Sequence, residues 1–221
     1  MMTKAEAIKR VLEIGVVPVV RAESAQQAMA AAEAVCAGGI PIVEVTMTVP
    51  GAVGVIAQLT KTMGGQVLIG AGTVLDAASA RLCLDAGAQF IVSPGFDAET
   101  VKLAVQEKIL MMPGALTPTE VITAWRAGAD FVKVFPCGSV GGPKYIKALK
   151  GPLPQVPMIP TGGVNLKTAG EFITAGAAAL GIGGELVSAA ALRAGDTRTI
   201  TEAAKQYVEI VRAARAAKAA Q

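Results

Sequence analysis

Short apolar segments recur along this chain at a nearly constant interval, with helix-like segments between them. The apolar runs are residues 16–21, 41–46, 67–72, 90–93, 109–113, 131–135, 157–161 and 179–183. Their centres lie roughly 23 residues apart, which is the length of one strand, one helix and two short loops. The runs are mostly continuous rather than alternating, so we expect strands that are buried on both faces.

The segments between the runs have helical spacing and suitable end signals. Examples are residues 25–37, 52–62, 76–86, 97–107, 119–127, 166–175 and 199–217. Candidate N-caps are Ser24, Asp76, Asp97, Thr117 and Asn165, and Ala-Gly pairs stand at 37–38, 86–87, 127–128 and 175–176. Residues 3–14 add an amphipathic helix before the first strand.

Eight successive strand–helix units with no break in composition predict a (β/α)8 TIM barrel. We expect one domain over residues 1–221, with the extra N-terminal helix covering one end of the barrel. A doubly wound sheet is the alternative. It usually has fewer strands and a Gly-x-Gly-x-x-Gly after the first strand, and none stands there.

Composition excludes several classes of function. Hydrophobic residues make up 52% and charged residues 17% of the chain, which is typical of a well-cored globular protein. The net charge is only +3 with scattered basic residues, so we expect no nucleic-acid partner. We also expect no membrane span and a cytoplasmic location, since there is no long apolar stretch and no secretory signal. Cys36, Cys83 and Cys137 are predicted to be reduced thiols.

The chain contains no histidine. This removes Ser-His-Asp and Cys-His nucleophile systems, histidine general bases and His-ligated metals. Acid–base chemistry must then use Glu, Asp, Lys, Tyr, Cys or water. We expect neither a metal nor another cofactor.

Glu44 and Lys133 are the only charges inside apolar strand runs. Burial favours the neutral amine of a lysine, which attacks carbonyl carbon, and a nearby carboxylate can move the protons of a Schiff-base reaction. The alternative interpretations are a snorkelling lysine or an inert buried ion pair. Such pairs stabilise poorly because desolvation offsets their attraction, so the pattern favours catalysis.

Further candidates stand where the predicted strands end, the usual place for chemistry in this fold. The Arg21 guanidinium suits a carboxylate, although a pair with Glu23 is the alternative. Thr73 and the Ser93-Pro94 pair are expected to line the mouth, the opening of the barrel at the carboxyl ends of its strands. The glycine pairs after the last two strands, with Thr161 beside them, predict a backbone anion site, although such glycines also simply make tight turns.

These motifs together resemble one family. They are Glu44-Val45-Thr46, Gly70-Ala71-Gly72-Thr73-Val74, Ser93-Pro94-Gly95, Lys133-Val134-Phe135-Pro136, Pro160-Thr161-Gly162-Gly163-Val164 and Gly181-Ile182-Gly183-Gly184. In order and spacing, from about residue 8 to residue 210, they resemble the 2-keto-3-deoxy-6-phosphogluconate (KDPG) / 4-hydroxy-2-oxoglutarate (KHG) aldolases.

The resemblance implies a metal-independent class I lyase of the Entner-Doudoroff pathway, usually a homotrimer. It would cleave KDPG to pyruvate and glyceraldehyde 3-phosphate, with KHG as a further substrate. The implied roles are Schiff-base formation for Lys133, acid–base catalysis for Glu44, substrate binding for Thr73, Pro94, Phe135 and Thr161, and phosphate binding for Gly162, Gly163, Gly183 and Gly184.

Two positions depart from the family pattern. Thr48 stands where many members have a carboxylate-binding arginine, and Arg21 is expected to take over that role from the first strand. Glu185 stands where many members have a phosphate-binding serine, which leaves the unphosphorylated KHG open as the substrate. A phosphosugar isomerase or epimerase, and a non-catalytic barrel that serves as an assembly scaffold, are the alternative functions.

Overall fold

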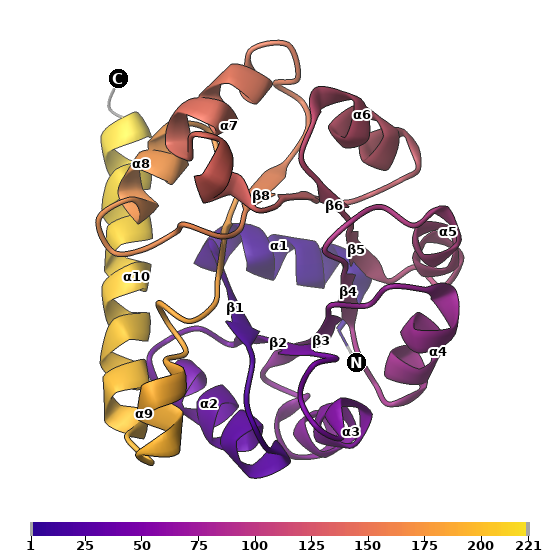
Figure 1. The fold of residues 1–221 in the computed structure, drawn as a ribbon, viewed down its shortest axis with the longest axis vertical. Coiled ribbons are helices and arrows are strands. Elements are labelled where there is room, and N and C mark those ends of the chain that lie inside the picture. The colour runs from indigo at the N-terminus through magenta and orange to yellow at the C-terminus, as the bar shows by residue number, and fades with distance from the viewer. Residues whose placement is uncertain (1, 220–221) are drawn as a thin grey trace.

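The computed structural model describes residues 2–219 as an α/β fold with strands towards the centre and helices around them (Figure 1). The helices are α1 (Lys4–Ile14), α2 (Ala25–Ala37), α3 (Ala52–Met63), α4 (Ala77–Asp85), α5 (Ala98–Gln106), α6 (Pro118–Arg126), α7 (Pro143–Lys150), α8 (Ala169–Thr174), α9 (Ala189–Arg193) and α10 (Thr197–Ala219), with a 3-10 helix η1 (Cys137–Val140). The strands are β1 (Val16–Val20), β2 (Ile42–Thr46), β3 (Leu68–Gly72), β4 (Phe90–Val92), β5 (Leu110–Met112), β6 (Gly114–Ala115), β7 (Val132–Val134), β8 (Met158–Pro160) and β9 (Leu180–Ile182). Each predicted apolar run contains a strand.

The strands lie in two parallel sheets. Six of them form a curled half-barrel in the order β5-β4-β3-β2-β1-β9, and β6, β7 and β8 form the second sheet. An isolated parallel bridge between Thr161 and Gly181 links the end of β8 to β9. The predicted run 109–113 contains β5 and ends at Pro113, which has no N–H to donate; the additional strand β6 begins after it and was not predicted.

Local sequence signals set the start of several helices. The side chains of Ser24, Asp76, Asp97 and Thr117 each accept a hydrogen bond from the backbone N–H three residues on, as predicted. The prediction for Asn165 is wrong, because α8 begins only at Ala169. Asn165 instead accepts from the N–H groups of Lys167 and Thr168 and stabilises a turn.

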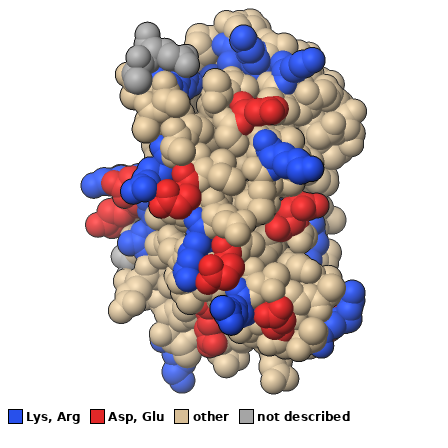
Figure 2. Space-filling model, turned by 90° about the vertical axis from the view of Figure 1, so that its left-hand side faces the viewer, with Lys and Arg blue, Asp and Glu red and all other residues tan. Residues whose placement is uncertain are grey.

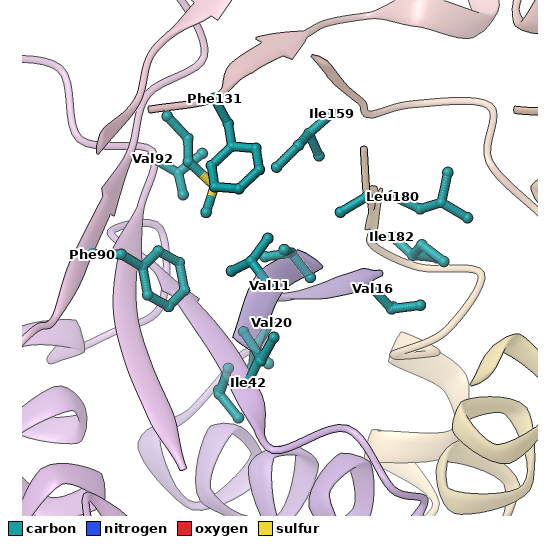
Figure 3. Close-up of a cluster of buried hydrophobic side chains, with 14 of the residues drawn as sticks. Val11, Val16, Val20, Ile42, Phe90, Val92, Phe131, Ile159, Leu180 and Ile182 are labelled. Atoms are coloured by element: carbon teal, nitrogen blue, oxygen red, sulfur yellow. The ribbon is translucent and has the colours of Figure 1, made fainter. Parts of the chain in front are cut away.

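Helix α1 covers the end of the fold at which the strands begin. Lys4 near its start pairs with Asp130, just before β7, at 3.0 Å. Val11 from the same helix is fully buried in the hydrophobic cluster of Figure 3, together with residues of β2 and β4 and with Phe131. This arrangement leaves the carboxyl ends of the strands as the accessible end.

The face that carries α10 shows charges of both signs side by side (Figure 2). Two pairs within the helix, Lys205–Glu202 and Arg212–Glu209, illustrate this at 2.8 and 3.0 Å. Large single-sign patches are what attract nucleic acid, and this face has none. Within residues 2–219, no helix has both the length and the apolar character that a bilayer crossing requires.

Candidate active site

Two charged side chains lie inside the strands at the accessible end. Glu44 of β2 is 2% exposed and Lys133 of β7 is 4% exposed, and no other charged residue among residues 2–219 is classed as buried. The remaining residues of both strands are also buried. The burial expected from the sequence is therefore present in the structure.

The carboxyl group of Glu44 is strongly desolvated. Burial raises its pKa above the ordinary value, although the positive charges of Lys133 and Arg21 act in the opposite direction. Its Oε1 atom is inaccessible to solvent and has no hydrogen-bond partner among residues 2–219. A carboxyl group whose pKa is raised in this way is suited to accept a proton and to return it.

The amino group of Lys133 lies beside an aromatic ring. Its Nζ is 5.3 Å from the centroid of Phe135, the residue that follows β7, which is within the range of a cation–π contact. The backbone N–H of Lys133 donates to Pro113 at 2.9 Å and so fixes the strand beneath the side chain. Phe135 thus forms one wall of the space around the amine.

Arg21 and Thr48 lie together at the ends of β1 and β2. They line a hollow of about 210 Å³ with Gln27 and Leu192, and both are exposed to solvent. The Thr48 hydroxyl is 2.7 Å from that of Thr46. Arg21 makes no ion pair with an acidic residue among residues 2–219, and Glu23, its alternative partner, pairs with Arg193 at 2.8 Å. The free guanidinium is therefore available to an anion.

Pro94 and Phe135 line a second hollow, of about 380 Å³, with Gly114 and Leu116. Thr73, at the end of β3, adopts a left-handed backbone with φ of 57°, which is uncommon for a threonine. Its side chain is partly exposed. These residues occupy the side of the mouth formed by β3, β4 and β6.

The predicted glycine turns present unpaired backbone donors. Gly162 and Gly163 have φ of 82° and 79°, so both are in the left-handed region. Among residues 2–219, no acceptor in a loop or turn pairs with the N–H groups of Gly163, Gly183 or Gly184. Thr161, beside the first pair, is buried. Successive free N–H groups of this kind can bind an anion.

Glu185, which directly follows Gly184, affects the pKa of a tyrosine in α10. Burial raises the pKa of Tyr207 in α10 to about 12, and the charge of Glu185 adds to that rise. The Glu185 side chain is exposed. Its carboxylate therefore lies within electrostatic reach of α10.

Sequence reasoning missed one part of this end of the molecule, the turn that contains η1. Gly138 of this turn donates its N–H to Gly162 at 2.8 Å, and a Cβ at Gly138 would lie 2.8 Å from the Cα of Gly163. Gly138, Gly141 and Gly142 were the available signal, because clustered glycines often mark a close approach of two backbones. Within residues 2–219, no group of three or more His, Cys, Asp or Glu side chains could hold a metal ion.

Comparison with known proteins identifies the fold and the family. The profile described as "Aldolase: KDPG and KHG aldolase" matches residues 7–203. The chain belongs to this family. Its members are carbon–carbon lyases.

Individual relatives extend over nearly the whole chain. The 2-dehydro-3-deoxy-phosphogluconate aldolase of Treponema pallidum is 37% identical and covers 96% of this chain and 99% of its own. A KDPG aldolase structure from Legionella pneumophila, with pyruvate captured as a covalent carbinolamine intermediate, has a TM-score of 0.82 at 32% identity, covering 89% of this chain and 96% of its own. A designed cube-shaped cage made by fusing symmetric oligomeric domains has a TM-score of 0.87 at 31% identity, covering 94% of this chain and 75% of its own.

Proposed function

We propose that this chain is a class I aldolase that cleaves KDPG to pyruvate and glyceraldehyde 3-phosphate, and that it also accepts KHG, which yields pyruvate and glyoxylate. The observation that carries the proposal is the buried pair of a lysine on β7 and a carboxyl group on β2, the only two charges buried within residues 2–219. Family membership and the carbinolamine of the Legionella relative support the same chemistry.

The reaction begins at Lys133. Its neutral amine attacks the C2 ketone of the substrate, and loss of water from the resulting carbinolamine gives an iminium ion. Glu44 supplies and removes the protons of this dehydration. The Phe135 ring keeps water away from one side of the amine.

Cleavage then uses the iminium as the electron sink. Glu44 takes the proton of the C4 hydroxyl, directly or through a water, while the C3–C4 bond breaks and its electron pair forms an enamine. The aldehyde leaves, C3 is protonated, and hydrolysis releases pyruvate and regenerates Lys133. The raised pKa of Glu44 fits a group that must both accept and return protons in one cycle.

We assign the substrate carboxylate to Arg21 and Thr48, with Thr73 and Pro94 on the opposite side of the mouth. The support is the hollow that brings Arg21 and Thr48 together and the lack of an acidic partner for Arg21 among residues 2–219. A guanidinium without a partner binds a carboxylate in a bidentate manner. Arg21 thus takes the role of the carboxylate-binding arginine that many family members have at the position of Thr48.

We assign the phosphate of KDPG to the free N–H groups of the two glycine turns, with Thr161 beside them. Glu185 directly follows this site, but its side chain is exposed, so solvent screens the repulsion between its carboxylate and a bound phosphate. We therefore keep KDPG as the main substrate and KHG as a further one.

We also propose a single closed (β/α)8 barrel, a homotrimer and a cytoplasmic location. The bridge between Thr161 and Gly181 supports closure, because it joins the second sheet to the half-barrel. The oligomeric domains of the designed cage support oligomerisation. The free thiols of Cys36, Cys83 and Cys137 fit a reducing compartment.

Trapping the imine tests the chemistry. Sodium borohydride added in the presence of pyruvate should leave a reduced pyruvyl group on Lys133, found by intact mass and peptide mapping. Lys133→Ala should lose both the adduct and cleavage of KDPG. Lys147→Ala is the matched control, because Lys147 is an exposed lysine of α7 and should leave the adduct unchanged.

A wild-type protein that forms no adduct, under conditions that label a known imine-forming aldolase, would reject the Schiff-base reaction. In that case an isomerase or epimerase with Glu44 as base becomes the better account. A Lys133→Ala variant that differs from wild type only in stability would point to the scaffold.

A further inference from the structure

Gly72 of β3 lies directly beside the carboxyl group of Glu44. In the parallel pairing of β2 with β3, Glu44 pairs with Gly70 and Thr46 with Gly72, so these side-chain positions face the same side of the sheet. A Cβ added at Gly72 would lie 2.6 Å from Cδ and 2.7 Å from Cγ of Glu44, and closer still to Oε1. The carboxyl group therefore occupies the space that a side chain at position 72 would fill.

Hydrogen bonding does not explain the position of Oε1. This atom is buried and has no partner among residues 2–219. A buried acceptor without a partner is unfavourable, so it stays only where packing leaves no better place. Packing against the bare backbone of Gly72 is the contact that the structure provides.

We propose that Gly72 is a positioning residue for Glu44, whose missing side chain makes the slot that holds the carboxyl group inside the mouth. This inference rests on the proposed function, because it gives Glu44 the acid–base role. Gly72 itself contacts no reacting atom. Its contribution is to keep Glu44 within reach of the C4 hydroxyl and out of bulk water.

A similar close approach occurs on β9. A Cβ at Gly181 would lie 3.1 Å from the Cβ of Thr161 and closer to Oγ1. Thr161 directly follows β8, so here too a glycine of one strand makes room for a polar side chain of the adjacent segment.

Gly70 makes room for a different neighbour. It lies two residues before Gly72 on the same strand and the same side and pairs directly with Glu44, but a Cβ there would enter the ring of Phe90. Phe90 is a fully buried core residue. Gly70→Ala and Gly72→Ala therefore add the same methyl group to the same strand, one against the core and one against Glu44.

A double-mutant cycle in urea tests the contact without reference to activity. Gly72→Ala should lower the unfolding midpoint of the wild type, and the loss should shrink by about half or more in a Glu44→Ala background. Gly54→Ala, at an open position in α3, is the control and should have the same effect in both backgrounds. If Gly72→Ala does not fold alone, a folded Glu44→Ala/Gly72→Ala protein supports the slot. Equal losses in both backgrounds, or a double variant that also fails to fold, overturn it.

Kinetics test the consequence for catalysis. Gly72→Ala should lower kcat on the order of 100-fold, with little change in KM for pyruvate, since displacement of a catalytic group by about 1 Å has that effect. Burial raises the pKa of Glu44, and Lys133 and Arg21 are the charged groups that act on it. A displaced carboxyl group is better hydrated or closer to those cations, so the acid limb of kcat should move to lower pH.

The two possible failures are distinguishable. A wild-type protein without a borohydride adduct at Lys133 overturns the proposed function, and the urea cycle still decides whether Gly72 makes the slot. A wild type that forms the adduct, with Gly72→Ala unchanged in kcat and in its pH profile, overturns the positioning role alone. Gly54→Ala, at an open position in α3, controls for the substitution itself.

Discussion

At the scale of single residues, the site depends on a carboxyl group that the fold makes costly to ionise. Glu44 is desolvated, and the two cations that act on it do not restore its ordinary pKa. Burial outweighs the effect of those cations, and a carboxyl group that holds its proton in this way can serve as a general acid as well as a general base.

This cost predicts a pH-dependent stability. The folded protein holds a proton on Glu44 above the pH at which the unfolded chain, with an ordinary value of 4.5, releases it. The contribution of Glu44 to the free energy of unfolding is therefore fully present below about pH 4.5 and is lost as the pH rises through the pKa of the folded protein. The glutamine side chain of Glu44→Gln cannot ionise. Between pH 4.5 and the pKa of the folded protein, the free energy of unfolding of this variant should therefore rise relative to that of the wild type by up to about 1.4 kcal/mol per pH unit. Urea unfolding from pH 5 to 9 measures the difference, and a flat difference would contradict the raised pKa.

Arg21 carries a second prediction at this scale. If its guanidinium binds the substrate carboxylate, Arg21→Ala should raise KM for pyruvate in the aldol direction by about 10–100-fold, the effect of losing a charge-assisted hydrogen bond of about 1.5–3 kcal/mol. Steady-state kinetics with variable pyruvate measure it. Arg212→Ala, which removes an exposed arginine of α10, is the control and should keep the wild-type KM. An unchanged KM in Arg21→Ala would reject the assignment.

At the scale of elements, the sequence predicts what depends on local chemistry. Apolar runs predict the strands because both faces of each strand are buried. Four N-caps could be predicted because the capping side chain bonds a backbone N–H only three residues further along the chain. The short helix α9 was not predicted, and α7 was expected only as one of eight helices, without bounds. Helix α7 has no side-chain cap at Gly142, and α9 has only five residues, too few for a helical period to be recognised.

In the candidate site, too, some features could be predicted from local sequence and others could not. Glu44 and Lys133 were visible in the sequence because charges in apolar runs need an explanation. The position of Arg21 beside Thr48 depends on how β1 and β2 pair, and the slot at Gly72 depends on the direction in which the Glu44 side chain leans. Neither follows from residue spacing, since strands far apart in the chain must first be brought together.

At the scale of the whole molecule, one hydrophobic core joins the two sheets. The cluster in Figure 3 includes Phe90 and Val92 of the six-stranded sheet, Ile159 of the three-stranded sheet, and Val11 of α1. Phe90 also fills the space above Gly70. Because both sheets bury side chains against the same cluster, we expect them to unfold in one transition.

The single tryptophan reports on the three-stranded sheet, so it can test whether both sheets unfold in one transition. Trp125 lies on α6, which packs on β6 and β7, whereas Phe90 lies on β4. Phe90→Ala should destabilise the protein by about 3–5 kcal/mol, and Leu75→Ala, at an exposed position, by no more than about 0.5 kcal/mol. In urea, tryptophan fluorescence and circular dichroism should shift together in Phe90→Ala. A fluorescence transition that stays at the wild-type midpoint while circular dichroism moves would show that the three-stranded sheet holds its own core.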